Sequence, residues 1–310
     1  MEKMVLMFPG VGSHHTGMGK FFFDHFQVAR DTFTEASDIL NINIGQMCFS
    51  AEEKSRLDQL ENSQLALLTV CAAMYRVFAQ EINAEPAYCL GHSLGEYSAL
   101  CCAGVMKFAD ALEIVKQRGR LLNSVASTMD GIMAWVINLD YKIVERICRD
   151  YSKPGKELYV SAYDSSTQSS ISGYKESVFS VGRLLEKEGA IVYPLKLSGP
   201  FHCPLMAPAA DQIKSVLQEY QYEQPIYPVI ANRNVQLYDG RESVVDNLSQ
   251  QLVQPIRWRD SIEFLIKKGI KTAVEIGPDK VLKHLMKNNT DAIHVYSFEN
   301  EKDLQRIVNG

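Results

Sequence analysis

The chain has few cysteines for a protein that is stabilised by disulfide bonds: seven occur among 310 residues. Their number is odd, their spacing is irregular, and no two of them form a C-x-x-C pair. This pattern excludes a disulfide framework and is typical of proteins whose thiols stay reduced. We therefore expect a cytoplasmic protein with free cysteines.

Long hydrophobic runs are also missing. The apolar stretch at the N-terminus spans residues 1–10 and is interrupted by Pro9. Such a run is too short for a membrane span or a secretory signal peptide. We expect it to form the first buried strand of a protein that does not associate with membranes.

The chain has no excess of positive charge. It contains 32 lysines and arginines and 37 aspartates and glutamates, which gives a net charge of −5. This balance excludes nucleic-acid binding through a global basic field, so an anionic partner must meet a local basic patch.

The sequence also lacks the residue spacing that is typical of a metal site. His14 and His15 are adjacent, which is a poor arrangement for two ligands of one ion. We therefore expect no metal and no bound cofactor.

What the chain does contain is an alternation of short apolar runs with longer amphipathic segments. This order is typical of an α/β protein with a mainly parallel sheet. Residues 5–8 and 88–90 are predicted strands of one core. Residues 63–74 predict a helix that is apolar nearly all round, and such a helix packs against the sheet. A chain of 310 residues accommodates one large core and a smaller subdomain.

The pattern changes near residue 128. Strands are predicted at 131–137, 159–163, 168–173 and 191–195, with helices around 144–148 and 178–188. The resulting order β-α-β-β-α-β is typical of a ferredoxin-like unit. We predict an α/β-hydrolase-like large domain in two parts, 1–127 and 198–310, with a ferredoxin-like subdomain over 128–197 inserted between them.

One motif carries chemistry. Gly91-His92-Ser93-Leu94-Gly95 lies between an apolar run and a run of small residues. A strand, a tight turn with glycine on both flanks, and a helix would expose the Ser93 hydroxyl as a nucleophile. The helix N-terminus would also favour the negative charge that develops during acyl transfer. An ordinary strand-to-helix turn remains the alternative.

Residues 91–100 (GHSLGEYSAL) closely resemble the nucleophile segment of malonyl-CoA:acyl carrier protein transacylases and of the acyltransferases of fatty-acid and polyketide synthases. The resemblance extends over nearly the whole chain. It includes 8–13 (FPGVGS), 117–120 (QRGR), 199–206 (GPFHCPLM), 251–258 (QLVQPIRW) and 275–278 (EIGP). Several motifs in the order of the family are far more specific than one Gly-x-Ser-x-Gly. The resemblance implies the same two-part fold.

The resemblance also implies a catalytic dyad. Ser93 is the nucleophile, and His202, in a loop stiffened by two prolines, is the base that a serine hydroxyl needs at neutral pH. In the family, the backbone carbonyl at the position of Gln251 orients this histidine, in place of the carboxylate of a triad. Main-chain N–H groups of Val11 and Leu94 form the oxyanion hole. Without the resemblance, His202 would more often be structural and Gln251 a surface residue.

Arg118 determines the expected substrate class. Its planar guanidinium is well matched to a carboxylate, and in the family the matching arginine holds the free carboxylate of malonyl. An arginine on such a helix is otherwise usually a solvated surface charge, as we expect for Arg120. Phe201 resembles the bulky ring of malonyl-selective members, which disfavours an α-methyl branch by about 1–3 kcal/mol. His92 is expected to be structural or to line the pocket.

The chain departs from the family pattern in two places. The opening loop of the family reads Gly-Gln-Gly-Ser-Gln, whereas this chain has Val11 and His14 at the glutamine positions. The main-chain donors remain, so we expect a retuned but active site. Secondly, Asp164 stands where the family has asparagine. Its negative charge near the entry of anionic substrates would weaken the binding of a CoA ester.

These observations predict a ping-pong malonyl transfer from malonyl-CoA to the phosphopantetheine thiol of an acyl carrier protein, catalysed by a monomer. The alternative is an acyl hydrolase that removes stalled acyl groups from carrier proteins with the same dyad. Arg118 favours the transferase, because a hydrolase of uncharged acyl groups gains nothing from a buried cation. The acceptor carrier protein belongs to either a fatty-acid or a polyketide pathway, and the altered opening loop weakly favours the polyketide pathway.

Overall fold

The computed structural model describes residues 3–82 and 84–308. Along the chain the elements are β1 (Met4–Phe8), α1 (Lys20–His25), α2 (Gln27–Leu40), α3 (Ile44–Phe49), η1 (Ala51–Glu53), α4 (Lys54–Leu57), α5 (Leu60–Glu81), β2 (Tyr88–Gly91), α6 (Leu94–Cys102), α7 (Phe108–Ala126), β3 (Gly131–Ile137), α8 (Tyr141–Tyr151), β4 (Leu158–Tyr163), β5 (Gln168–Tyr174), α9 (Lys175–Lys187), β6 (Ile191–Ser198), η2 (Pro204–Met206), α10 (Ala207–Gln218), β7 (Val229–Ile230), α11 (Arg241–Gln251), α12 (Trp258–Lys267), β8 (Thr272–Ile276), α13 (Val281–Lys287), β9 (His294–Phe298) and α14 (Glu301–Val308).

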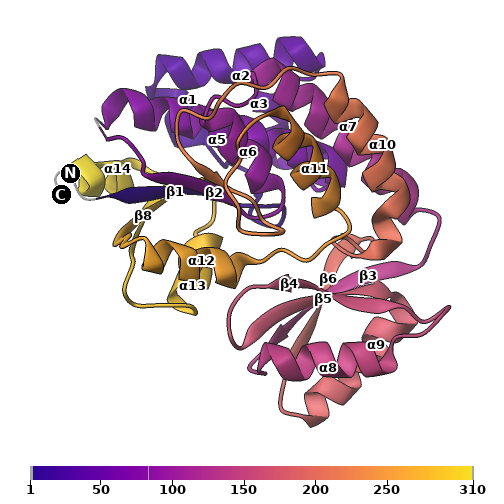
Figure 1. Cartoon of the computed structure of the whole chain (residues 1–310). Coiled ribbons are helices and arrows are strands. Elements are labelled where there is room, and N and C mark those ends of the chain that lie inside the picture. Colours follow the sequence, from indigo (N-terminus) through magenta and orange to yellow (C-terminus); the bar gives the residue numbers. More distant parts are fainter. Residues whose placement is uncertain (1–2, 83, 309–310) are drawn as a thin grey trace.

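The large domain is built around a parallel sheet with the strand order β7-β2-β1-β8-β9. The central strand β1 is buried on both faces. Leu6 and Phe8 belong to the core under α5, α6 and α7, whereas Val5 and Met7 belong to the core under α12 and α13. Figure 1 shows these two groups of helices on opposite sides of the sheet. Coverage on both faces explains why β1 is a continuous apolar run.

The small subdomain has an antiparallel sheet with the order β4-β5-β3-β6. Its two helices, α8 and α9, pack against one face and share a separate hydrophobic core with the strands. The chain order β3-α8-β4-β5-α9-β6 is the predicted β-α-β-β-α-β. The structure therefore confirms the predicted α/β fold with a parallel sheet and an inserted ferredoxin-like unit.

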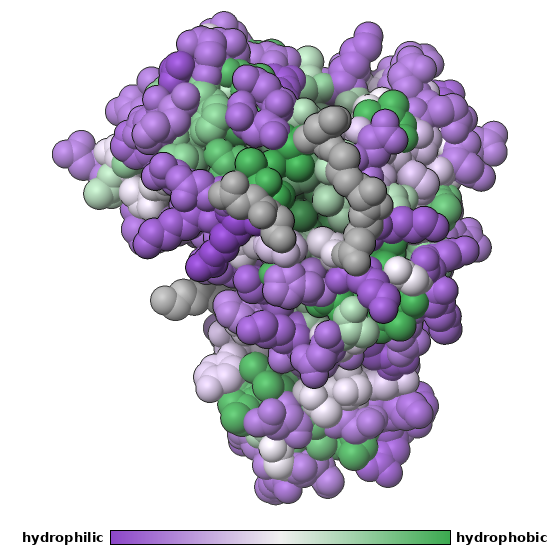
Figure 2. Space-filling model, turned by 90° about the vertical axis from the view of Figure 1, so that its left-hand side faces the viewer, coloured by the Kyte–Doolittle hydropathy of each residue, from purple (hydrophilic) through white to green (hydrophobic). Residues whose placement is uncertain are grey.

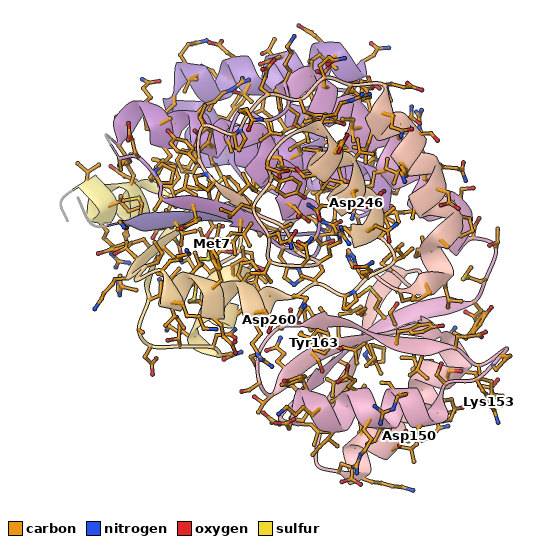
Figure 3. All side chains as sticks on the ribbon, in the orientation of Figure 1. Met7, Asp150, Lys153, Tyr163, Asp246 and Asp260 are labelled. Atoms are coloured by element: carbon orange, nitrogen blue, oxygen red, sulfur yellow. The ribbon has the colours of Figure 1, made fainter. Side chains whose placement is uncertain are left out.

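The two parts meet along β4. The N–H of Tyr163 donates to the carbonyl of Ile256 at 2.8 Å, and the N–H of Ile256 donates to the carbonyl of Ser161 at 3.0 Å. Figure 3 shows Tyr163 at the end of the subdomain that faces the large domain, with Asp150 and Lys153 on the far side. This backbone pairing fixes the wall that the small sheet contributes to the site described below.

Figure 2 shows the molecular surface on the side of β1 and α14, where hydrophobic residues gather in the upper half of the view and in smaller groups lower down. Hydrophilic residues cover much of this surface. Within the described part of the chain, none of the helices combines the length and the apolar character needed to cross a membrane.

Candidate active site

The Gly-x-Ser-x-Gly segment makes the strand–turn–helix that the motif predicts. β2 ends at Gly91, α6 begins at Leu94, and Ser93 between them has φ 54° and ψ −111°. A Cβ on Gly91 would lie 1.9 Å from the backbone of Gly95, and a Cβ on Gly95 would lie 1.9 Å from the carbonyl oxygen of Phe8. Only glycine fits at both flanks, and Ser93 between them is half-buried and lines the cavity described below.

Ser93 lies beside His202, although 109 positions separate them. The distance from Ser93 Oγ to His202 Nε2 is 2.8 Å, and Nδ1 of the same ring is 2.8 Å from the carbonyl oxygen of Gln251. Because a carbonyl only accepts hydrogen bonds, Nδ1 carries the ring proton. Nε2 is therefore the acceptor that faces the serine hydroxyl, which is the tautomer required of a general base.

Burial keeps His202 uncharged. Desolvation lowers the pKa of its imidazole to about 3, and the hydrogen bond to the Gln251 carbonyl opposes this effect only in part. The ring is thus neutral at pH 7, in the state that can take a proton from Ser93.

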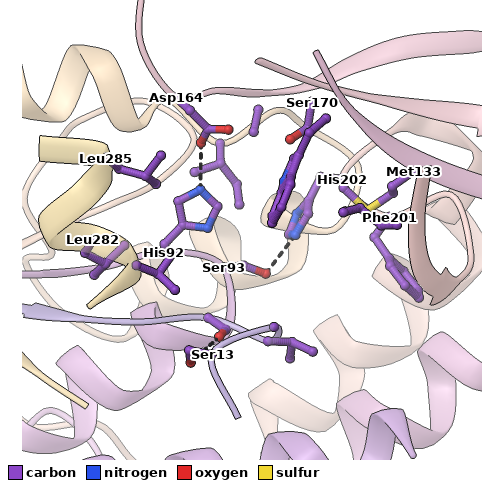
Figure 4. Close-up of a pocket in the computed structure, with 18 of the residues that line it drawn as sticks. Ser13, His92, Ser93, Met133, Asp164, Ser170, Phe201, His202, Leu282 and Leu285 are labelled. Atoms are coloured by element: carbon purple, nitrogen blue, oxygen red, sulfur yellow. Dashed lines mark hydrogen bonds and ion pairs between the residues drawn. The ribbon is translucent and has the colours of Figure 1, made fainter. Parts of the chain in front are cut away.

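Both residues open into a cavity of about 300 Å³ between the large domain and the small sheet. Figure 4 shows Phe201 and Met133 on one side of the Ser93–His202 pair, and His92, Leu282 and Leu285 on the other. The wall also includes residues from the loop after β1, from α7, from β5, from α13 and from the position that follows α13: Gly10, Val11, Gly12, Ser13, Arg118, Gln168, Ser170, His284 and Asn288.

Arg118 lies on α7, lines this cavity and is 2% exposed. Its Nη1 donates to the side-chain oxygen of Gln64, and its Nη2 donates to Oε1 of Gln251 at 3.3 Å. Nε is buried without a hydrogen-bond partner. None of the ion pairs found among the described residues involves this guanidinium. A buried cation held by neutral amides is an incomplete arrangement that an anionic ligand would complete.

The sequence matches the family model described as "Acyl transferase domain" over residues 5–303. The malonyl CoA-acyl carrier protein transacylase of Bacillus subtilis is 34% identical over 307 residues, or 99% of this chain and 76% of that protein. The protein of that name from Escherichia coli K12 is 35% identical over 294 residues, 94% of each chain. The chain belongs to the acyl transferase family.

Solved structures of family members have the same fold as this acyl transferase over 99% of its chain. The malonyl CoA-acyl carrier protein transacylase of Coxiella burnetii superposes with a TM-score of 0.96 at 31% identity, covering 99% of this chain and 97% of the other. A malonyl-transacylase solved in complex with a type II polyketide synthase acyl carrier protein superposes with a TM-score of 0.95 at 32% identity, covering 99% of both chains.

The remaining predicted site residues of this acyl transferase lie around the same cavity. Val11 lines it beside the turn at residues 91–95, the nucleophile elbow. Leu94 is the first residue of α6, where helix N–H groups have no intrahelical partner. Phe201 is buried in the wall. His14 is a loop residue: its Nδ1 accepts the N–H of Gly12 at 3.3 Å.

His92 and Asp164 form a pair. Nε2 of His92 lies 3.0 Å from Oδ1 of Asp164, and the carboxylate side chain is only 4% exposed. Asp164 therefore lies in the cavity wall, and its weakening of CoA-ester binding stays a prediction. Its side chain is buried in the pocket wall and faces the His92 imidazole.

Sequence reasoning missed the polar groups behind the dyad. Glu96, in the first turn of α6, accepts hydrogen bonds from the N–H of Asn232 at 2.9 Å, the hydroxyl of Tyr238 at 2.6 Å and Nε2 of Gln251 at 2.5 Å. Asn232 in turn accepts the N–H of Ser93 at 2.9 Å. Burial raises the pKa of Glu96 to about 7. A charged residue three positions after the nucleophile, inside an apolar helix, was a signal in the sequence; Asn232 had none.

Among residues 3–82 and 84–308, no three His, Cys, Asp or Glu side chains are grouped closely enough to hold a metal ion. The cavity wall instead offers a nucleophile, a base, a buried cation and apolar side chains.

Because the pKa of His202 is lowered on folding, its protonation opposes folding in acid. The unfolded chain takes up a proton below pH 6.5, whereas the folded ring stays neutral down to about pH 3. Stability is therefore lost as the pH falls below 6.5. Between pH 7.5 and pH 5 we expect the free energy of unfolding of the wild type to fall by about 2 kcal/mol more than that of His202→Gln. Urea titrations of both proteins at each pH measure this, and parallel curves would contradict it.

Proposed function

We propose that this acyl transferase moves a malonyl group from malonyl-CoA to the phosphopantetheine thiol of an acyl carrier protein, through a malonyl ester on Ser93. Two kinds of observation support this. The relatives that match nearly the whole chain are named malonyl CoA-acyl carrier protein transacylases, and one similar structure holds an acyl carrier protein. The cavity contains the groups that this reaction requires.

The observation that carries the proposal is the environment of Arg118. The guanidinium lines the same cavity as the dyad and is buried. Among the described residues it donates hydrogen bonds to neutral amides, makes no direct ion pair, and keeps an Nε without a hydrogen-bond partner. This arrangement favours an acyl group with a free carboxylate. We also propose that the ring of Phe201, in the same wall, disfavours a branch next to that carboxylate.

In the first half-reaction, His202 Nε2 takes the proton of the Ser93 hydroxyl while Oγ attacks the thioester carbonyl. The N–H groups of Val11 and Leu94 stabilise the oxyanion. When the tetrahedral intermediate collapses, the carbon–sulfur bond breaks and His202 returns the proton to the departing CoA thiolate. The Gln251 carbonyl keeps the ring in the required tautomer throughout.

The second half-reaction reverses these steps. His202 takes the proton of the carrier-protein thiol, the sulfur attacks the malonyl ester, and the proton returns to Ser93 Oγ as the serine leaves. Arg118 holds the malonyl carboxylate between the two steps. Water in place of the thiol would give free malonate, which is the hydrolase outcome of the experiment below.

Helix α13 is the part of the cavity wall that suits anionic carriers. Val281, Leu282, His284 and Leu285 line the cavity, and Lys280, Lys283 and Lys287 lie on the same short segment. The overall negative charge of the chain makes such a local cluster necessary for CoA phosphates or an acidic carrier protein. We propose that these lysines attract the donor and the acceptor to the cavity.

The further parts of the proposal concern the whole molecule. We propose a monomer that works in the cytoplasm; the seven cysteines, all free of disulfide bonds, support a reducing compartment. We also propose 128–197 as the bounds of the inserted subdomain, whose sheet begins at Gly131 in β3 and ends at Ser198 in β6. Light scattering after gel filtration tests the oligomeric state.

The experiment that tests the function is intact-mass measurement of every species. The enzyme is incubated with malonyl-CoA, and purified holo-carrier protein is then added. We expect a malonyl adduct on the enzyme that persists without the acceptor and moves to the carrier protein when it is added. Rapid loss of the adduct as free malonate, unaffected by carrier protein, would instead establish a hydrolase.

Arg118→Ala tests the substrate class. Truncating one partner of a buried charge pair costs about 2–5 kcal/mol, so we expect malonyl transfer to fall by about 30-fold or more. Acetyl transfer is expected to stay equal or to rise, because acetyl has no carboxylate. The matched control is Arg120→Ala on the same helix, whose exposed side chain pairs with Glu61; its transfer rates should not change. Equal losses of both acyl groups in Arg118→Ala would show a purely structural role.

A further inference from the structure

The side-chain amide of Gln251 joins the three functional groups of the site. Its Nε2 donates to Oε2 of Glu96 at 2.5 Å and to the carbonyl oxygen of Ser93 at 2.9 Å. Its Oε1 accepts from Nη2 of Arg118 at 3.3 Å. The backbone carbonyl of the same residue orients His202. One buried residue thus contacts the nucleophile, the base and the carboxylate-binding arginine.

An amide of this kind can turn over, exchanging its N–H₂ and oxygen ends, and only its neighbours decide which end faces which way. The Ser93 carbonyl accepts hydrogen bonds and cannot donate. The same holds for the ionised carboxylate of Glu96. With both amide hydrogens directed to these acceptors, the oxygen of Gln251 is the end that faces Arg118.

Glu96 itself is held as an acceptor. The N–H of Asn232 and the hydroxyl of Tyr238 donate to Oε1, which leaves Oε2 for Gln251. The residue is 1% exposed, so water does not replace these partners. Glu96 is not among the described residues that line the cavity. Glu96 acts on Arg118 in two ways: through the hydrogen bonds of Gln251, and by direct attraction between the two charges. The Gln251→Met variant below separates them, because it removes the amide and keeps both charges.

We propose that Glu96 is a positioning residue that determines acyl selectivity: its carboxylate sets the orientation of the Gln251 amide, and this orientation holds the Arg118 guanidinium in place for an acyl carboxylate. This inference rests on the proposed malonyl transfer. It assigns to a buried acid behind the elbow a role in choosing between malonyl and acetyl, beyond a role in stabilising the fold.

Glu96→Gln is the informative substitution, because it keeps the shape but allows both amides to turn over. The amide at position 96 keeps its oxygen toward the N–H of Asn232 and turns its N–H₂ toward Nε2 of Gln251, so that two donors meet. The Ser93 carbonyl is then the one acceptor left to the Gln251 amide, which shifts or turns over, and Arg118 loses its acceptor. We expect kcat/KM for malonyl-CoA to fall about 10- to 100-fold relative to that for acetyl-CoA, the range for one lost hydrogen bond to a charged group. Assays at pH 8 keep Glu96 of the wild type ionised, since burial raises its pKa to about 7.

Two variants separate this role from a structural one. Tyr238→Phe removes another donor to the same carboxylate but leaves Gln251 bonded, so its ratio of malonyl to acetyl transfer should equal that of the wild type. Glu96→Asp retains a carboxylate and should retain most of the selectivity, even where the total rate falls. If Glu96→Gln lowers malonyl transfer and acetyl transfer by the same factor, as a purely structural change would in either variant, the proposal is overturned.

If Glu96→Gln does not fold, as judged by circular dichroism, Gln251→Met supplies the same test. It removes the side-chain amide and keeps the backbone carbonyl that orients His202, so we expect a similar loss of selectivity. An unchanged malonyl-to-acetyl ratio in this variant would also overturn the proposal. Failure of the function itself looks different, since the wild type would then acquire no malonyl adduct at all.

Discussion

The Ser93→Ala variant should acquire no mass on incubation with malonyl-CoA, whereas the wild type acquires one malonyl group. The physical reason is the elbow. Steric exclusion at Gly91 and Gly95 places Ser93 Oγ at the N-terminus of α6, 2.8 Å from His202 Nε2. Alanine removes the only atom that forms the ester and adds none, so the fold and the cavity remain while the chemistry is lost.

A matched control is available in the same cavity. Ser170 on β5 also lines the wall, and Figure 4 shows it apart from Ser93. Ser170→Ala should acquire the malonyl group as the wild type does. Intact-mass spectra of the three proteins after the same incubation show which of them carries the malonyl group. An adduct on Ser93→Ala would mean that another side chain is the nucleophile.

The His202→Ala variant should form the adduct about 10²–10⁴-fold more slowly. Without the ring, no group takes the hydroxyl proton as Oγ attacks, and the departing thiolate leaves unprotonated. Because desolvation lowers the pKa of this imidazole to about 3, the wild-type base is neutral over the whole range in which the enzyme would be assayed. The wild-type rate should therefore show no acid limb near pH 6.5, the ordinary value for histidine.

Rapid quench with mass detection measures both rates. His284→Ala is the control, because His284 lines the cavity from α13 and is exposed. It should slow acylation far less than His202→Ala, and unchanged circular dichroism shows that each variant folds. Acylation of His202→Ala at a near-normal rate would remove this residue from the mechanism.

The sequence was sufficient where structure depends on near neighbours. The strand at 88–90, the turn and the helix after it follow from glycine sterics and from the apolar runs on either side, and the structure has β2, Ser93 at φ 54° and α6 there. The order of elements in the inserted subdomain was readable for the same reason, since alternating and helical periodicities are properties of consecutive residues. The family motifs added the positions of Arg118 and His202.

The approach of remote segments was decided only by the tertiary structure. Ser93 and His202 are 109 residues apart, Glu96 and Gln251 are 155 apart, and His92 and Asp164 are 72 apart. The contact of Asp164 with His92 could not be predicted for this reason, because its partner comes from the other part of the molecule. The network around Glu96 escaped prediction as well. Whether a buried acid is paired, and which end of an amide faces an arginine, depends on groups that packing brings together from distant parts of the chain, and no local pattern records them.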